Sequence, residues 1–171
     1  NIILKANPYV EDLKIELGKL QFLTNDCSKC SVLYICEPLS EQALQQYGDE
    51  YYWGYTEKEA LQFFLKNINV LDCVVSRIKI RPHPSENKYK YDWAKQSSSL
   101  HIEIGGNKTL LEETVEADIV VGCESMAMVV GLLAKKRVIS SIPPGGKPCS
   151  LPHSEIEQLQ ALLTDTSSLN H

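Results

Sequence analysis

The sequence predicts an α/β fold, a Rossmann-like open parallel sheet with helices on both faces. Strand-like apolar runs alternate with helix-like amphipathic runs along most of the chain, which is the pattern of a parallel sheet covered by helices. Polar side chains interrupt the apolar pattern where several of these strands end. The 171 residues, 43% of them hydrophobic, are enough for one domain with a sizeable core and too few for two full-sized α/β domains.

Five apolar or alternating runs are predicted to be strands. Each is short and is bounded by turn residues or by the start of a helical pattern. With the helices between them, they give at least four βα repeats in one sheet. The predicted strands are Leu33–Cys36, Arg77–Arg81, Leu100–Ile104, Asp118–Val121 and Arg137–Ser140.

Capping signals predict where the helices begin. Thr56 to Glu59 form a capping box, and the apolar residues that follow share one face at helical spacing. Asn107 is a predicted cap of the next helix, and residues 124–134 are predicted to be helical and apolar on most sides. Ser154 to Glu157 resemble the capping box of a last helix that reaches about Leu163.

The predicted domain organisation has three parts. Residues 31–163 form the Rossmann-like domain, expected to bind a nucleotide-sugar. Residues 1–30 are predicted to contain a strand, an amphipathic helix and a linker, which could belong to an interdomain region, and residues 164–171 are a frayed polar tail. The chain begins with Asn1 rather than Met, so we expect it to be part of something longer or processed.

Charge and hydropathy exclude several classes of protein. The formal net charge is -5, which argues against a general nucleic-acid binder because such binding depends on Lys and Arg that neutralise phosphates. No apolar run approaches the length of a transmembrane helix, and no leader sequence is evident. The cysteines at 36, 73 and 123 lie in or beside apolar runs, as free thiols do in a reducing compartment. We therefore expect a cytoplasmic protein, with peripheral association at the inner face of a membrane as an alternative.

His83 follows a predicted strand in the sequence Arg81-Pro-His-Pro84. Because proline fixes φ, Pro82 and Pro84 restrict the backbone on both sides of His83. A His held at a strand end can donate to a phosphate or stabilise a leaving group as it departs. The alternative is a structural His in a proline-rich turn.

Ser125 lies in a predicted strand-to-helix turn, Gly122-Cys-Glu-Ser125. The first amides of a helix have no partner within the helix and carry partial positive charge, so a phosphate oxygen can bind there. The Ser125 hydroxyl would add one more donor. The alternative is that Ser125 only caps the helix.

Glu103 lies between two apolar residues in Ile102-Glu-Ile104, near the end of a predicted strand. A carboxylate in that position can accept hydrogen bonds from two hydroxyls, which is how acidic residues at strand ends hold a ribose diol. The alternative is that Glu103 lies on the outward phase of a half-exposed strand.

Three other features carry less information. The aromatic segment Tyr51-Tyr-Trp53 could be a stacking surface for a base or sugar, or a loop packed against the sheet or a domain interface. Gly105-Gly106 and Gly145-Gly146 lack the spacing of dinucleotide and P-loop motifs. Cys27 and Cys30 have the spacing of half a zinc site, but no second pair accompanies them, so no metal is expected.

Taken together, these residues resemble the C-terminal, nucleotide-binding domain of bacterial sialyltransferases with the two-Rossmann glycosyltransferase B fold. Arg81-Pro-His-Pro84 is similar to the basic-x-His-Pro motif of that family, and Glu103 to its ribose-binding Glu. Ser125 lies where the family has a serine pair. The resemblance spans roughly residues 33–163 and consists of short motifs, which CDP-glycerol phosphotransferases and capsule polysialyltransferases partly share.

The resemblance implies a role for each matched residue. His83, as the catalytic residue, would contact the donor phosphate and assist the departure of CMP. Arg81 would approach the cytosine, Glu103 would hold the ribose hydroxyls, and Ser125 would bind the phosphate. The predicted nucleotide-binding residues also include Pro84, Gly122, Glu124 and Met126.

The function implied is donor binding in a bacterial glycosyltransferase of polysaccharide biosynthesis, with a CMP-linked sugar such as CMP-sialic acid and a glycan acceptor. No cofactor is implied. The family's acceptor-activating base lies in an N-terminal domain, so this chain alone is expected to bind nucleotide weakly and to catalyse little. Glu124 departs from the serine pair, and its charge would repel a phosphate unless it points away. The alternatives are a UDP-sugar epimerase, a CDP-polyol phosphotransferase-like domain, or a non-catalytic domain of the same fold.

Overall fold

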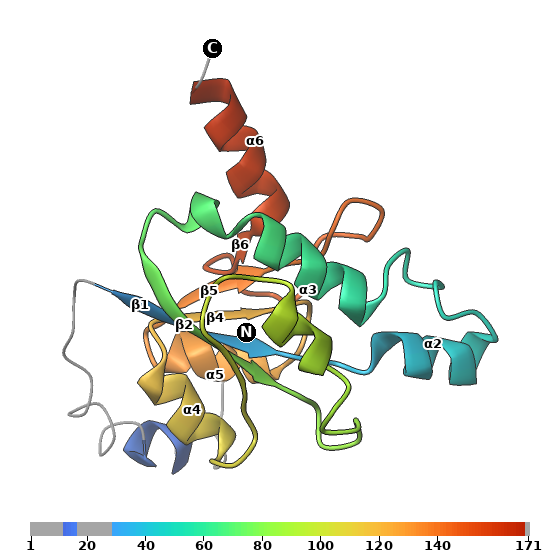
Figure 1. Ribbon diagram of the computed structural model, residues 1–171, viewed down its shortest axis with the longest axis horizontal. Helices are drawn as coiled ribbons and strands as arrows, with labels where there is room; N and C mark the ends of the chain where they lie inside the picture. The colour runs from blue at the N-terminus through green and yellow to red at the C-terminus, as the bar shows by residue number, and fades with distance from the viewer. Residues whose placement is uncertain (1–11, 17–28, 170–171) are drawn as a thin grey trace, which may run out of the picture.

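The computed structural model describes residues 12–16 and 29–169, and its centre is a six-stranded parallel sheet (Figure 1). The strand order is β3-β2-β1-β4-β5-β6, and all the pairs are parallel. This arrangement confirms the predicted Rossmann-like fold class. The strands are β1 (Cys30–Ile35), β2 (Val75–Arg81), β3 (Ile102–Ile104), β4 (Ile119–Gly122), β5 (Arg137–Ser140) and β6 (Glu157–Gln158).

Helices and short 3-10 segments connect the strands. They are α2 (Leu39–Tyr47), α3 (Glu57–Lys66), η2 (Ile68–Leu71), η3 (Asp92–Gln96), α4 (Leu110–Glu116), α5 (Ala127–Leu133) and α6 (Leu159–Leu169). Residues 12–16 form a further short helical segment. Figure 1 shows α3 and α4 on opposite sides of the sheet, while α2 and α6 extend away from the body.

The central strands β1 and β4 are buried on both faces, and their successive side chains point to opposite faces of the sheet. On β1, Val32 packs in the core shared with α3, η2 and η3, whereas Leu33 packs in the core shared with α5. Both side chains are almost fully buried. A strand covered on both faces reads as a continuous apolar run, which explains why β1 was recognisable in the sequence.

The predicted capping box of α3 is confirmed. The Thr56 hydroxyl accepts a hydrogen bond from the Glu59 backbone N–H at 3.3 Å, and the Thr56 N–H donates to the Glu59 carboxylate at 3.2 Å. The helix then buries Leu61 and Phe64 against the sheet.

Other helix predictions need correction. Thr109, not Asn107, caps α4, because its hydroxyl accepts from the Glu112 N–H. The predicted last helix forms but begins later than the signal at Ser154 indicates; Glu157 pairs with Ile139 in the sheet, and α6 begins at Leu159. Tertiary pairing overrides the local capping signal here.

The chain ends also differ from expectation where they are described. α6 continues to Leu169, so this part of the predicted tail is helical. Of the predicted N-terminal strand, helix and linker, only 12–16 and the residues from 29 onward are described, and Cys27 lies outside those ranges.

The strand order reverses beside β1. The chain passes from β1 to β2 and β3 on one side and then returns to place β4 on the other side of β1. The connections at the carboxyl ends of β1 and β4 therefore lead away in opposite directions, and the space between them is where open α/β sheets bind ligands. The fold thus places the residues after Ile35 and Gly122 at the edge of the sheet where a ligand site is expected.

Gly131 allows α5 to lie close to the sheet. A Cβ at this position would lie 2.9 Å from Val138 Cγ2 and 3.1 Å from Val120 Cβ. We predict that Gly131→Val lowers the free energy of unfolding by about 1–3 kcal/mol, since overpacking a buried contact forces neighbours apart. Urea denaturation measures the loss. In the control Gln62→Val, on the exposed face of α3, the helix-propensity cost should be about 0.7 kcal/mol or less; equal losses would contradict this account.

Candidate functional site

A cavity of about 510 Å³ lies at the carboxyl edge of the sheet, where the strand order reverses. Its walls come from the segment after β1, the α2 to α3 connection, the segment after β4 and the loop after β5. Its size is within the range of small-molecule sites. The lining residues are Glu37, Leu39, Gln42, Tyr52, Trp53, Tyr55, Glu124, Ile142, Lys147, Pro148 and Ser150.

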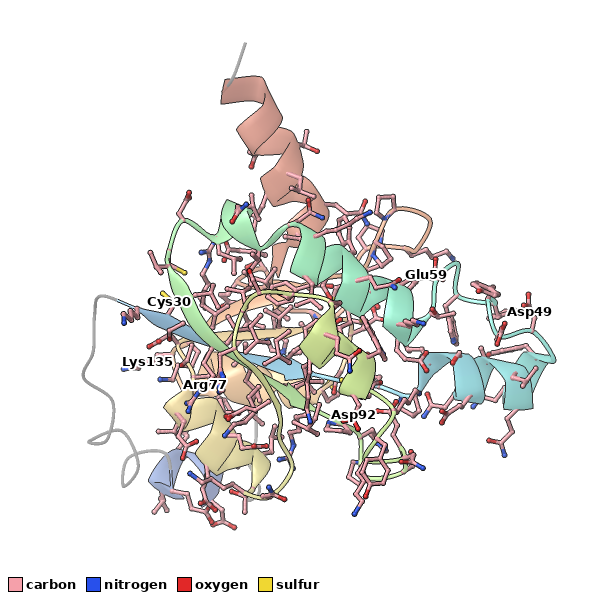
Figure 2. All side chains as sticks on the ribbon, in the orientation of Figure 1. Cys30, Asp49, Glu59, Arg77, Asp92 and Lys135 are labelled. Atoms are coloured by element: carbon pink, nitrogen blue, oxygen red, sulfur yellow. The ribbon has the colours of Figure 1, made fainter. Side chains whose placement is uncertain are left out.

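Aromatic rings form one wall of the cavity. Tyr52 and Trp53 pack edge to face with ring centroids 5.0 Å apart, and Tyr47 stacks on Tyr52 at 3.6 Å. Tyr52 remains 50% exposed and Trp53 43% exposed. Figure 2 shows this end of the molecule, where Asp49 marks the α2 to α3 connection. The rings contact one another and still keep surface exposed, which is compatible with a stacking surface and with a domain interface.

Two carboxylates line the same cavity and are joined through the backbone. Glu37 accepts a hydrogen bond from the Glu124 N–H at 3.2 Å, and the Glu124 carboxylate accepts from both the N–H and the hydroxyl of Ser150. Burial raises the pKa of the Glu37 carboxyl above its ordinary value, and the nearby charge of Glu124 raises this pKa further. The Glu37 carboxylate can accept hydrogen bonds, and in its protonated form it can also donate one.

His83 is exposed in the loop after β2 and does not line this cavity. Its Nδ1 accepts a hydrogen bond from the Ser85 backbone N–H at 3.1 Å and lies 2.8 Å from the Ser85 hydroxyl. Because a backbone N–H can only donate, Nδ1 is the acceptor and the neutral ring carries its proton on Nε2. In that tautomer, Nε2–H is a hydrogen-bond donor.

Glu86 anchors the His83 loop. Its carboxylate accepts from the His83 N–H at 2.8 Å and, through its other oxygen, from the Tyr91 hydroxyl and the Lys90 ammonium, each at 2.6 Å. The Glu86 side chain is fully buried. The loop is therefore fixed by a buried, charge-assisted network as well as by its prolines.

Lys90 is the centre of that network. Its ammonium also contacts the carboxylates of Glu41 and Glu57, which tie in α2 and α3. Burial opposes ionisation of Glu57, but hydrogen bonds from Lys90 and Ser40 hold the pKa of its carboxyl below the ordinary value. Glu41, Glu57 and Glu86 are close enough together to hold a metal ion. The Lys90 ammonium already supplies the positive charge among these three carboxylates.

Arg81 lies at the end of β2, as predicted, but its guanidinium is directed to α4. It donates to the buried Glu113 carboxylate and to the Lys108 carbonyl oxygen, the latter at 2.9 Å. Glu113 also receives the Gly106 N–H. Arg81 thus fixes the connection from β3 to α4, and the predicted contact with a cytosine stays a prediction.

Glu103 lies on edge strand β3, three strands from β4. Its carboxylate forms ion pairs with Lys79 at 3.6 Å and with Arg77 and His101 at 3.7 Å. In Figure 2, Arg77 lies on the side of the molecule opposite Asp49. Glu103 therefore faces basic side chains of the neighbouring strand rather than the cavity, and its predicted role with ribose stays a prediction.

Ser125 lies in the turn between β4 and α5. Its hydroxyl accepts from the Ala127 N–H at 3.1 Å, but the N-cap of α5 is Met126, which makes no side-chain cap hydrogen bond. The predicted contact of Ser125 with a phosphate stays a prediction. Gly122 is buried, and a Cβ there would lie 3.1 Å from the Met128 sulfur. Met126 is 65% exposed.

The structure brings only part of the predicted site together. Glu124 lines the cavity, whereas His83, Glu103 and Ser125 do not. Pro84 is exposed beside His83. Glu37 and Lys147 also line the cavity and were not predicted. Glu37 could have been found, because it is the first charged residue after the buried run that forms β1 and therefore obeys the same strand-end rule as Glu124.

Comparison with known proteins gives few relatives. No protein-family model and no curated protein matches the sequence. Two solved structures from Thermosulfurimonas dismutans are similar over most of this chain. The first is the β-Kdo 2,4 transferase of KpsC, which has 14% sequence identity and a TM-score of 0.47; the match covers 92% of this chain and 51% of that chain. The second is the β-Kdo 2,7 transferase of KpsC, which has 15% sequence identity and a TM-score of 0.49; the match covers 93% of this chain and 52% of that chain.

The chain thus spans about half the length of the two structures. At this level of identity and superposition, the likeness concerns the path of the chain. Among the described residues, no helix has both the length and the apolar character needed to cross a membrane.

Glu86→Gln tests the network beneath His83. We expect a loss of about 1.5–3 kcal/mol in the free energy of unfolding, because the variant removes a buried charged acceptor that serves three donors. The matched control is Glu41→Gln, which alters a carboxylate of the same cluster that is 56% exposed and should cost less than about 1 kcal/mol. Chemical denaturation of both variants gives the values, and similar losses would show that Glu86 has no special structural role.

Proposed function

We propose that this chain is the donor-binding domain of a glycosyltransferase that uses a CMP-linked sugar, such as CMP-sialic acid, and transfers the sugar to a glycan hydroxyl. The observation that carries the proposal is the cavity of about 510 Å³ at the reversal of strand order, with aromatic rings and hydrogen-bonding side chains on its walls. The cavity supports ligand binding, and the choice of CMP depends on the resemblance of the His83, Glu103 and Ser125 motifs.

In the proposed reaction, the bond between the anomeric carbon and the phosphate oxygen breaks, and its electron pair stays with the phosphate. The acceptor oxygen forms the new bond and gives its proton to a general base in another domain. His83, exposed in the loop after β2, would donate from Nε2–H to the departing phosphate and stabilise its charge. Arg81 and Glu103 would have to leave their present partners before they could take part.

A non-catalytic or structural domain of the same fold is the second candidate. The observation that favours it is that His83, Glu103 and Ser125 do not line the cavity. A UDP-sugar epimerase or a CDP-polyol phosphotransferase-like domain would use the same edge of the sheet with a different nucleotide. Nucleotide preference therefore separates these candidates.

Calorimetric titration with CMP, UDP and CDP tests the proposal. We expect CMP to bind, and we expect His83→Ala to weaken binding by about 10-fold, the loss of one hydrogen bond to a charged group. Lys95→Ala is the control, because Lys95 is exposed on η3, pairs with Asp92 and does not line the cavity. Its affinity for CMP should be unchanged.

Each other outcome has a distinct meaning. Stronger binding of UDP or CDP favours the alternative enzymes. No heat with CMP at millimolar concentration, or equal affinity of the His83→Ala variant and the wild type, would overturn the CMP version. No binding of any of the three nucleotides would favour the non-catalytic domain.

A further inference from the structure

We propose that the cavity at the end of β1 and β4 is a subsite for an uncharged, hydroxyl-bearing ring, with Tyr52 and Trp53 as its stacking wall and Glu37 and Glu124 as its hydroxyl acceptors. This inference rests on the proposed function and adds to it which part of the ligand the cavity holds. The neutral ring would enter the cavity, and the phosphate would stay outside it.

The aromatic wall is suited to a ring. Trp53 packs edge to face against both Tyr47, at 5.7 Å, and Tyr52, at 5.0 Å, so its orientation is fixed before a ligand arrives. Both Tyr52 and Trp53 still keep close to half of their surface exposed while they line the cavity. A pre-ordered aromatic face binds a flat or faceted ring at low entropic cost.

The polar groups of the cavity select for hydroxyls. The hydrogen bond from the Glu124 N–H engages Oε2 of Glu37, and the Ser150 hydroxyl and amide both engage Oε1 of Glu124. One oxygen of each carboxylate is therefore held by a hydrogen bond within the protein. Because both oxygens of a carboxylate can accept, the other oxygen can accept from a ligand hydroxyl. Two carboxylates that line one cavity can accept hydrogen bonds from the hydroxyls of a ribose or a hexose.

The charge of the lining opposes an anion. Two carboxylates, Glu37 and Glu124, line the cavity with a single cation, Lys147. A phosphate or a sugar carboxylate in this space would be repelled more strongly than it would be attracted. Burial keeps the pKa of Glu37 above its ordinary value, so this group loses its charge more easily than an exposed Glu and can become a donor to a hydroxyl.

Two ligands share the required chemistry, namely the nucleoside of the donor and a neutral acceptor glycan. The 171-residue chain can be titrated calorimetrically with cytidine, lactose, inorganic phosphate and N-acetylneuraminic acid. We expect cytidine or lactose to bind, and we expect no binding of phosphate or N-acetylneuraminic acid in the cavity. Cytidine binding assigns the cavity to the nucleoside, and lactose binding assigns it to the acceptor.

Variants then locate the binding. Trp53→Leu should lower the affinity for the neutral ligand by about 5- to 150-fold, the range for loss of one stacking contact. Glu37→Gln should lower this affinity as well, because the amide of Gln is a weaker acceptor for a hydroxyl than the carboxylate of Glu. The two tryptophans allow a direct readout: with Trp93→Phe, the remaining Trp53 fluorescence should respond to the neutral ligand. Unchanged melting temperatures show that the variants are folded.

The outcomes distinguish this inference from the proposed function. If CMP binds but cytidine and lactose do not, or if Trp53→Leu and Glu37→Gln bind the neutral ligand as the wild type does, the subsite is overturned and donor binding stands. If lactose binds through Trp53 and no nucleotide binds, the subsite stands and the donor-binding function fails. If neither nucleotides nor neutral ligands bind, both are overturned.

Discussion

The pairing of β1 with β2 on one side and β4 on the other is the constraint on which the rest of the structure depends. Val32, Leu33 and Tyr34 pair in register with both neighbours. Because β1 is buried on both faces, a shift of its register by one residue would move apolar side chains between the two cores. Beyond the ends of β1 and β4, the Glu124 N–H donates to the Glu37 carboxylate, and both residues line the cavity.

Electrostatic organisation divides the carboxyl edge into two regions. Near β2, cations are already neutralised: Lys90 is held by three carboxylates, and Arg81 is held by Glu113. Near β4, the lining carboxylates outnumber the one lysine. A charged donor would therefore meet structural ion pairs at β2 and a hydroxyl-accepting cavity at β4. The net charge of the chain gives no information about this division, because binding depends on the local groups.

Much of the fold was predictable from the sequence, because local patterns and tertiary structure agree there. The bounds of β5 were predicted as they occur, and the Thr56 capping box marks the start of α3. β6 was missed because its two residues are ordered by pairing with β5, against the local capping signal at Ser154. The site was only partly predictable. Glu124 obeys the strand-end rule, but the partners that occupy Arg81 and Glu103 come from other elements, which no local pattern reveals.

The central claim, that the reversal of strand order beside β1 is the ligand site, is tested most directly by amide NMR during titration with CMP. We predict that the largest shift changes fall on Glu37, Trp53 and Glu124, including the Trp53 indole N–H. Changes centred instead on the separate groove of about 350 Å³ between residues 12–16 and α4, which Thr109 and Val130 line, would contradict the account.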